Sequence, residues 1–80
     1  MENILIQTIR KVIPKLPEKD IPIGIKYLED RNFDALQELT DSAIIKVKRD
    51  KKRVNSKYSD IDVSELERLS IMVTNYKDNL

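Results

Sequence analysis

Apolar residues recur at spacings of three and four along most of this 80-residue chain, and this period is the feature that most constrains its fold. The pattern is clearest from residue 33 to residue 51, where its apolar positions include Phe33, Leu36 and Val47. Spacings of three and four place side chains on one face of an α-helix, whereas a half-buried strand requires strict alternation. Asn32 precedes this run and is a favourable N-cap. We therefore predict a long helix here.

The same period returns in three further segments. Pro14 and Pro17 interrupt it first, because proline lacks a backbone N–H and restricts the residue before it. Asp62 precedes the last run and, with Glu65 three residues later, resembles a capping box. The predicted fold class is therefore all-α, a small bundle of about four helices in one domain that spans residues 1–80. The helices are expected at residues 2–13, 22–30, 33–51 and 63–78.

Residues 21–25 allow two interpretations. Asp20 is suited to cap a helix that has Pro22 in its first turn. The alternating isoleucines of the same stretch instead resemble a short strand. We favour the helix, because a single strand in an otherwise helical chain would have no partner.

The residue types that are absent exclude most catalytic chemistry. The chain has no His and no Cys, so it cannot form a Ser-His-Asp triad, a thiolate nucleophile or a disulfide. Zinc sites draw mainly on the same two residues. Gly24 is its only glycine, which excludes a Walker A loop and a dinucleotide-binding fingerprint. We expect no enzyme activity, no cofactor, no metal and no small-molecule substrate.

Charge is segregated along a chain whose formal net charge is only +1. Residues 46–57 hold seven basic side chains against Asp50, which is a local charge of +6. Residues 29–41 and 60–67 each sum to −4. The basic segment is therefore the candidate contact surface for nucleic acid or for an acidic partner. Its cations are Lys46, Lys48, Arg49, Lys51, Lys52, Arg53 and Lys57.

Two features weaken the nucleic-acid interpretation of this segment. Apart from Tyr58, just beyond its end, it contains no aromatic residue on which bases could stack. The isoelectric point of about 7.9 is also below the value above ~9 that is typical of dedicated nucleic-acid domains. Solvated cations at a helix end, where they complement the dipole, are a sufficient alternative.

A second candidate surface consists of bulky apolar residues outside the main helical stripes. In the last segment, the predicted seam is formed by Leu66, Leu69, Val73, Tyr76 and Leu80. If the residues outside the stripes gathered in one place, they would form the kind of exposed patch that marks a protein interface. The candidate interface residues are Ile4, Ile23, Ile45, Ile71 and Met72.

Two functional hypotheses follow from these features. The first is a non-enzymatic helical interaction protein or structural subunit of a larger assembly, for instance an accessory protein of a phage virion. It binds a protein partner or associates with itself. The alternative is a nucleic-acid-binding regulator or packaging factor that uses residues 46–57. The longest aliphatic run, Ile4-Leu5-Ile6, is far shorter than the roughly 20 residues of a membrane span, and the N-terminus lacks the basic flank of a signal peptide. We therefore expect an intracellular or virion location, neither secreted nor in a membrane.

Overall fold

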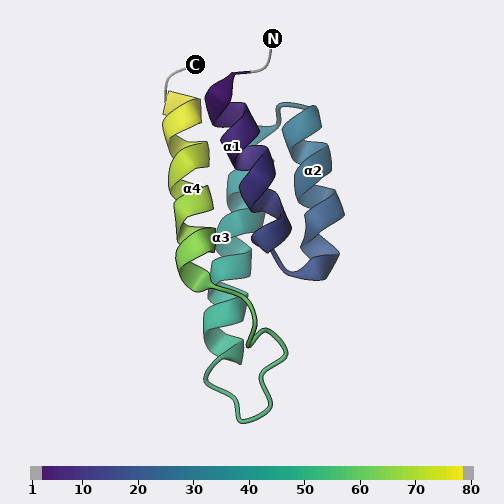
Figure 1. The fold of residues 1–80 in the computed structure, drawn as a ribbon, viewed down its shortest axis with the longest axis vertical. Coiled ribbons are helices and arrows are strands. Elements are labelled where there is room, and N and C mark those ends of the chain that lie inside the picture. The colour runs from purple at the N-terminus through teal and green to yellow at the C-terminus, as the bar shows by residue number, and fades with distance from the viewer. Residues whose placement is uncertain (1–2, 79–80) are drawn as a thin grey trace.

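Four α-helices make up most of residues 3–78, which are the residues that the computed structural model describes. No strand occurs within this range, and the predicted all-α bundle is confirmed (Figure 1). Two 3-10 turns, Ile13–Lys15 and Glu18–Asp20, connect the first two helices. The helices are α1 (Ile4–Val12), α2 (Ile21–Glu29), α3 (Phe33–Asp50) and α4 (Val63–Asp78).

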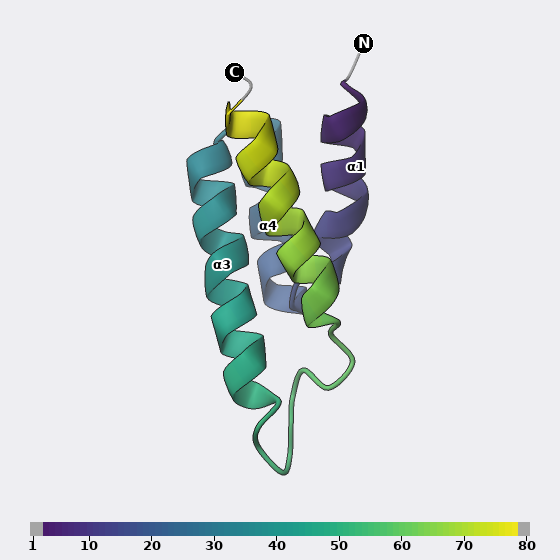
Figure 2. The ribbon, with the colours of Figure 1, turned by 90° about the vertical axis from the view of Figure 1, so that its left-hand side faces the viewer.

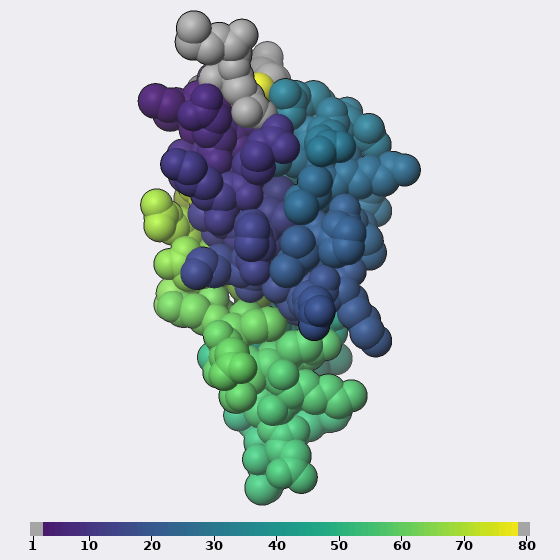
Figure 3. Space-filling model, turned by 45° about the vertical axis from the view of Figure 1, so that its right-hand side comes forward, coloured from purple at the N-terminus to yellow at the C-terminus, as the bar shows by residue number. Residues whose placement is uncertain are grey.

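The longest helices, α3 and α4, run antiparallel and form the most extensive contact in the molecule (Figure 2). α1 packs against α4, and α2 packs against α3, so each long helix is also covered by a short one. The molecule measures 45 × 21 × 18 Å. It narrows towards the loop between α3 and α4, which projects away from the helices at the end opposite the two termini (Figures 1 and 3).

A single apolar core fills the space between the helices. Ile9 from α1, Leu28 from α2, Leu36 from α3 and Leu69 from α4 are each fully buried there. Burying a side chain of this size stabilises the fold by about 1.5–3 kcal/mol relative to leaving it in water. The spacing of three and four that predicted the helices is therefore also what lets them share one core.

The first helix is shorter than predicted. It begins at Ile4, because Asn3 is the N-cap and its side chain accepts a hydrogen bond from the backbone N–H of Leu5 at 2.7 Å. It ends at Val12 rather than at residue 13, and the chain continues as the 3-10 turn that contains Pro14. The predicted start at residue 2 lies outside the described residues.

The other helix boundaries lie within one residue of their predicted positions. Residues 21–25 are helical, as favoured, but Asp20 does not cap them with its side chain. Its carboxylate instead accepts a hydrogen bond from the ammonium group of Lys46 in α3 at 3.3 Å. Asn32 caps α3 through Ala35, and Asp62 holds the start of α4 through the backbone N–H of Ser64 at 2.9 Å.

The turn between α2 and α3 contains a left-handed residue. Arg31 has a φ of 57°, a conformation that glycine adopts more readily. The backbone N–H of Asn32 bonds the carbonyl of Tyr27 at 2.9 Å, which is the hydrogen bond of a Schellman motif. Three residues, Asp30, Arg31 and Asn32, therefore suffice to reverse the chain into an αα-hairpin.

A ladder of polar contacts joins α3 to α4 along their exposed edge. Gln37 bonds Thr74 at 2.7 Å, and Asp41 accepts from the hydroxyl of Ser70 at 2.6 Å. Near the termini, Lys77 pairs with Asp34 at 2.6 Å. These contacts fix the register of the two long helices outside the apolar core.

Candidate docking site

The end of α3 and the loop after it carry the basic segment. We call residues 46–58 the basic tip. Lys46, Lys48 and Arg49 project from the last turns of α3, and the other four predicted cations lie in the loop. All seven side chains are exposed.

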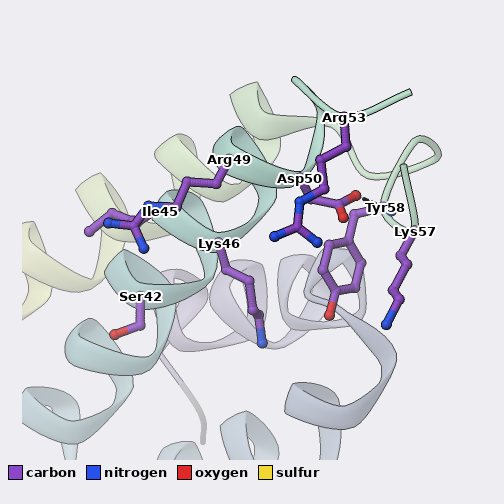
Figure 4. A pocket seen from close by; sticks show the side chains of 8 residues that line it. All are labelled: Ser42, Ile45, Lys46, Arg49, Asp50, Arg53, Lys57 and Tyr58. Carbon is purple, nitrogen blue, oxygen red and sulfur yellow. Dashed lines mark hydrogen bonds between the residues drawn. The ribbon is translucent and has the colours of Figure 1, made fainter. Parts of the chain in front are cut away.

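Four of the seven cations surround a hollow on one side of the tip. The hollow has a volume of about 500 Å³, and Figure 4 shows the side chains that line it. The remaining cations, Lys48, Lys51 and Lys52, are not part of its lining. The structure thus divides a surface that the sequence presents as one continuous run. The lining residues are Ser42, Ile45, Lys46, Arg49, Asp50, Arg53, Lys57 and Tyr58.

Asp50 holds the loop against the end of α3. Its side chain is only 7% exposed, and one carboxylate oxygen accepts hydrogen bonds from the Ser56 hydroxyl at 2.6 Å and the Tyr58 backbone N–H at 2.9 Å. The hydroxyl of Ser56 above all, and the backbone N–H of Tyr58 next, lower the pKa of Asp50 below its usual value, while burial opposes them. Lys57 and Arg53 add smaller lowering contributions to this pKa. A carboxylate at a helix C-terminus opposes the dipole, so these loop donors are what make the position favourable.

Sequence reasoning missed this role, because Asp50 entered it only as one negative charge within a basic run. The sequence feature that could have indicated this role is the polar pair Asn55-Ser56, a few residues after Asp50. Ser and Asn readily bond backbone and side-chain groups close to them in sequence.

Lys46 and Tyr58 form the wall of the hollow nearest the body of the molecule. The Lys46 ammonium lies 5.8 Å from the centroid of the Tyr58 ring, a cation–π distance, and it also pairs with Asp20. Tyr58 is half-buried against the core. Lys46 therefore has two partners within the chain and is less available than the other cations of the tip.

The predicted apolar interface has members on all four helices. Its four exposed members lie on four different helices, and their exposed fractions are 79% for Ile4, 43% for Ile23, 55% for Ile45 and 61% for Ile71. The fully exposed Val54, in the loop, was not predicted.

Met72 was wrongly predicted as a surface residue. It is 9% exposed and belongs to the core. The reason is that α4 packs against both α1 and α3, so its buried face is wider than a single heptad seam. Leu80, the last residue of the predicted seam, lies outside the described residues.

Two structural features are absent from residues 3–78. No group of three or more acidic side chains is placed to hold a metal ion in this range. None of the helices described is both long and apolar enough to cross a bilayer.

Comparison of the chain with family models, with curated proteins and with solved structures gives no match.

Proposed function

We propose that this chain is a non-enzymatic helical interaction module, a structural subunit that attaches to an acidic partner protein through the basic tip. One observation carries the proposal: most cations of the tip have no carboxylate partner in the described part of the chain. Lys46 pairs with Asp20, and Arg53 lies close enough to Asp50 to lower its pKa. Among residues 3–78, the other five form no ion pair.

The body of the molecule uses its charges differently. There, Lys77 pairs with Asp34, and Arg68 lies 4.0 Å from Glu65. Exposed ion pairs contribute little stability, at about 0–1 kcal/mol each. Cations left without such pairs are still available to a partner, and their clustering at a protruding end raises the rate of encounter with an acidic surface.

An acidic protein suits the tip better than a nucleic acid does. Lys46 occupies a position over the Tyr58 ring, so that ring offers a poor platform for base stacking. Double-stranded DNA carries about one charge per 1.7 Å of its axis. A duplex lying across the narrow end would meet the acids of residues 60–67 as well as the cations. Those acids would repel the phosphates of the duplex. A small acidic patch on a protein, with an apolar side chain that contacts Ile45, would avoid this repulsion.

Support for a non-catalytic role comes from the residues of the hollow. The chain has no His or Cys, and the carboxylate of Asp50 is already engaged by the loop. General acid–base work requires a group within reach of a substrate proton and a pKa near the working pH. A lowered pKa moves Asp50 away from that requirement. The intracellular or virion setting, including an accessory role in a phage particle, remains part of this proposal.

The proposal is tested by measuring the affinity of the chain for a fluorescent, Glu-rich peptide that contains leucine. The variant Arg49→Glu/Arg53→Glu/Lys57→Glu should bind it about tenfold more weakly or worse, because three attractions become repulsions. The matched control is Lys11→Glu/Lys15→Glu/Lys26→Glu, which reverses three exposed cations outside the tip. It should keep its affinity within about twofold. Equal losses in both variants would refute docking through the tip.

Nucleic-acid binding is the second candidate, favoured by the seven cations within residues 46–57. It is tested with duplex and single-stranded oligonucleotides in the same assay. Binding through about six phosphates should weaken roughly 10³-fold between 50 and 200 mM salt. Tight, salt-sensitive oligonucleotide binding together with no binding of the acidic peptide would replace the first proposal by the second.

A further inference from the structure

The outward face of α3 carries a row of exposed side chains whose chemistry changes along the helix. We call Glu38, Asp41, Ile45, Arg49 and Lys52 the α3 ridge. Successive members are three or four residues apart, so they follow one face, and all five are exposed. Lys52 lies in the turn just after the helix, where its backbone N–H still bonds the carbonyl of Arg49 at 3.3 Å. On the outer side of α3, at the left of Figure 2, no other element covers the helix.

The ridge is ordered as acid, apolar, base. Asp41 and Arg49 each lie four residues from Ile45, and Glu38 and Lys52 each lie seven residues from it. At a rise of about 1.5 Å per residue, these separations are about 6 Å and 10.5 Å along the helix axis. The charges on the two sides of Ile45 are therefore opposite in sign and equal in spacing.

A surface with this symmetry is complementary to itself when one copy is reversed. In an antiparallel pair centred on Ile45, Asp41 of each copy faces Arg49 of the other. Glu38 faces Lys52 in the same way, and the two Ile45 side chains meet at the axis. A parallel pair would instead place like charges opposite each other. We infer that two copies of this chain associate through the α3 ridge, antiparallel about a twofold axis at Ile45.

The other contacts of the ridge residues leave them available for this pairing. Among residues 3–78, Glu38, Arg49 and Lys52 form no ion pair within their own chain. Asp41 gives one carboxylate oxygen to Ser70, and the second oxygen remains for a partner. Ile45 is 55% exposed and gains burial from its symmetry mate. A twofold interface requires one patch to contact itself, and the ridge meets that requirement.

This inference rests on the proposed function and deepens it, because it names a second copy as the partner of the part of the tip that belongs to α3. The loop cations Arg53 and Lys57 lie off the ridge and are left for another acidic partner. The two proposals share Arg49 and Ile45, so the test must separate self-association from docking on a different protein.

The test is the oligomeric state, measured by sedimentation equilibrium from about 10 µM to about 1 mM at about 50 mM salt. We expect a monomer–dimer equilibrium with no larger species. Arg49→Asp should raise the dimer dissociation constant about tenfold or more, because each substitution acts twice across the axis. Ile45→Asp should abolish the dimer. The control Lys26→Glu, on exposed α2 surface with the same change of charge sign, should leave it intact.

The decisive experiment exchanges two opposite charges within one chain and asks whether the dimer returns. Arg49→Asp combined with Asp41→Arg restores opposite charges across the twofold axis, so the dimer should return to within about threefold of its original affinity. Lys52→Glu with Glu38→Lys repeats the exchange and leaves the bond between Asp41 and Ser70 in place. Each variant should fold, because every substituted side chain is exposed, and circular dichroism checks this.

The outcomes separate the two proposals. A chain that stays monomeric at about 1 mM, or single variants that the paired exchange does not rescue, would overturn the α3 ridge dimer. Growth beyond a dimer would also overturn it, because a head-to-tail contact does not close. In each case, binding of the Glu-rich peptide by the wild-type chain would keep the proposed function. A wild-type chain that does not bind the Glu-rich peptide, but whose dimer the paired exchange rescues, would refute that function alone.

Discussion

The helical body and the basic tip of this molecule are held together in different ways. In the body, side chains from every helix meet in one core, and polar contacts such as those from Gln37 to Thr74 and from Asp41 to Ser70 cross between α3 and α4. In the tip, one carboxylate, that of Asp50, ties back the loop, and most of the cations point into solvent. Folding therefore depends on the helical body, while the proposed binding chemistry lies in the basic tip. Substitutions in the two regions should therefore have separable effects.

The largest expected effect comes from emptying part of the core. Leu36 is fully buried, and Leu36→Ala should lower the free energy of unfolding by about 2–5 kcal/mol, because the transfer free energy is lost and a cavity remains. Urea denaturation followed by circular dichroism measures this change. A domain of this size has only about 3–5 kcal/mol to lose, so the milder Ile9→Val, at about 0.5–1.5 kcal/mol, serves as a second variant. Binding of the acidic peptide per folded molecule should not change in either variant, and a change would mean that body and tip are coupled.

An intermediate and local effect is expected when Asp50 loses its charge. The pKa of Asp50 is lower in the folded chain than in the unfolded chain. The ionised carboxylate therefore contributes its full stabilisation of the folded loop above the ordinary Asp pKa of about 3.9. The contribution is lost as the pH falls through the lowered folded value. Acid should therefore lower the protection of the loop amides against hydrogen exchange, relative to the intrinsic rate at the same pH and at Tyr58 above all, before it lowers that of the amides of α1 or α4.

Asp50→Asn provides the control for this acid effect. The variant should show fast exchange in the loop at neutral pH and no further acid-dependent loosening, because no carboxylate remains to titrate. Loop amides that stay as protected in Asp50→Asn as in the wild-type chain would show that Asp50 does not hold the loop.

The smallest expected effect is at the end of the tip. Val54 is fully exposed, and Val54→Ala should change the free energy of unfolding by no more than about 0.5 kcal/mol. The same urea denaturation experiment measures this change and that of Leu36→Ala. The two apolar truncations thus compare the loss of stability in the tip with that in the body. A loss of more than about 1 kcal/mol would mean that the loop packs against something in solution.

Much of the architecture could be predicted from local patterns. The period of three and four located α3 and α4, and Pro14 marked the end of α1. Asn32 was identified as a cap because the preference for such residues depends only on the first turn of a helix. Asp20 was misassigned because its carboxylate bonds Lys46, which lies 26 residues further along the chain. A local pattern contains no information about a contact at that distance.

The candidate docking site was predicted less completely than the fold. The order of charged residues along the chain identified the basic segment and its charge of +6. It could not separate the cations that line the hollow from Lys48, Lys51 and Lys52, because that depends on how the loop folds back onto Asp50. Ile45 was singled out as a surface apolar residue, and its exposure bears this out. Its proximity to Ser42 and Arg49 follows from the helical spacing of three and four, whereas the loop residues Lys57 and Tyr58 join them around the hollow only in three dimensions (Figure 4).

Sequence alone therefore established which segments are helical, where they begin and end to within one or two residues, and where charge accumulates. These properties depend on neighbours within a few positions. Tertiary structure decided that α4 buries Met72 between two neighbouring helices, and that Asp50 supports the loop rather than merely diluting its charge. Such properties depend on which side of each helix meets another element, and helix packing sets that geometry only once all the elements are assembled.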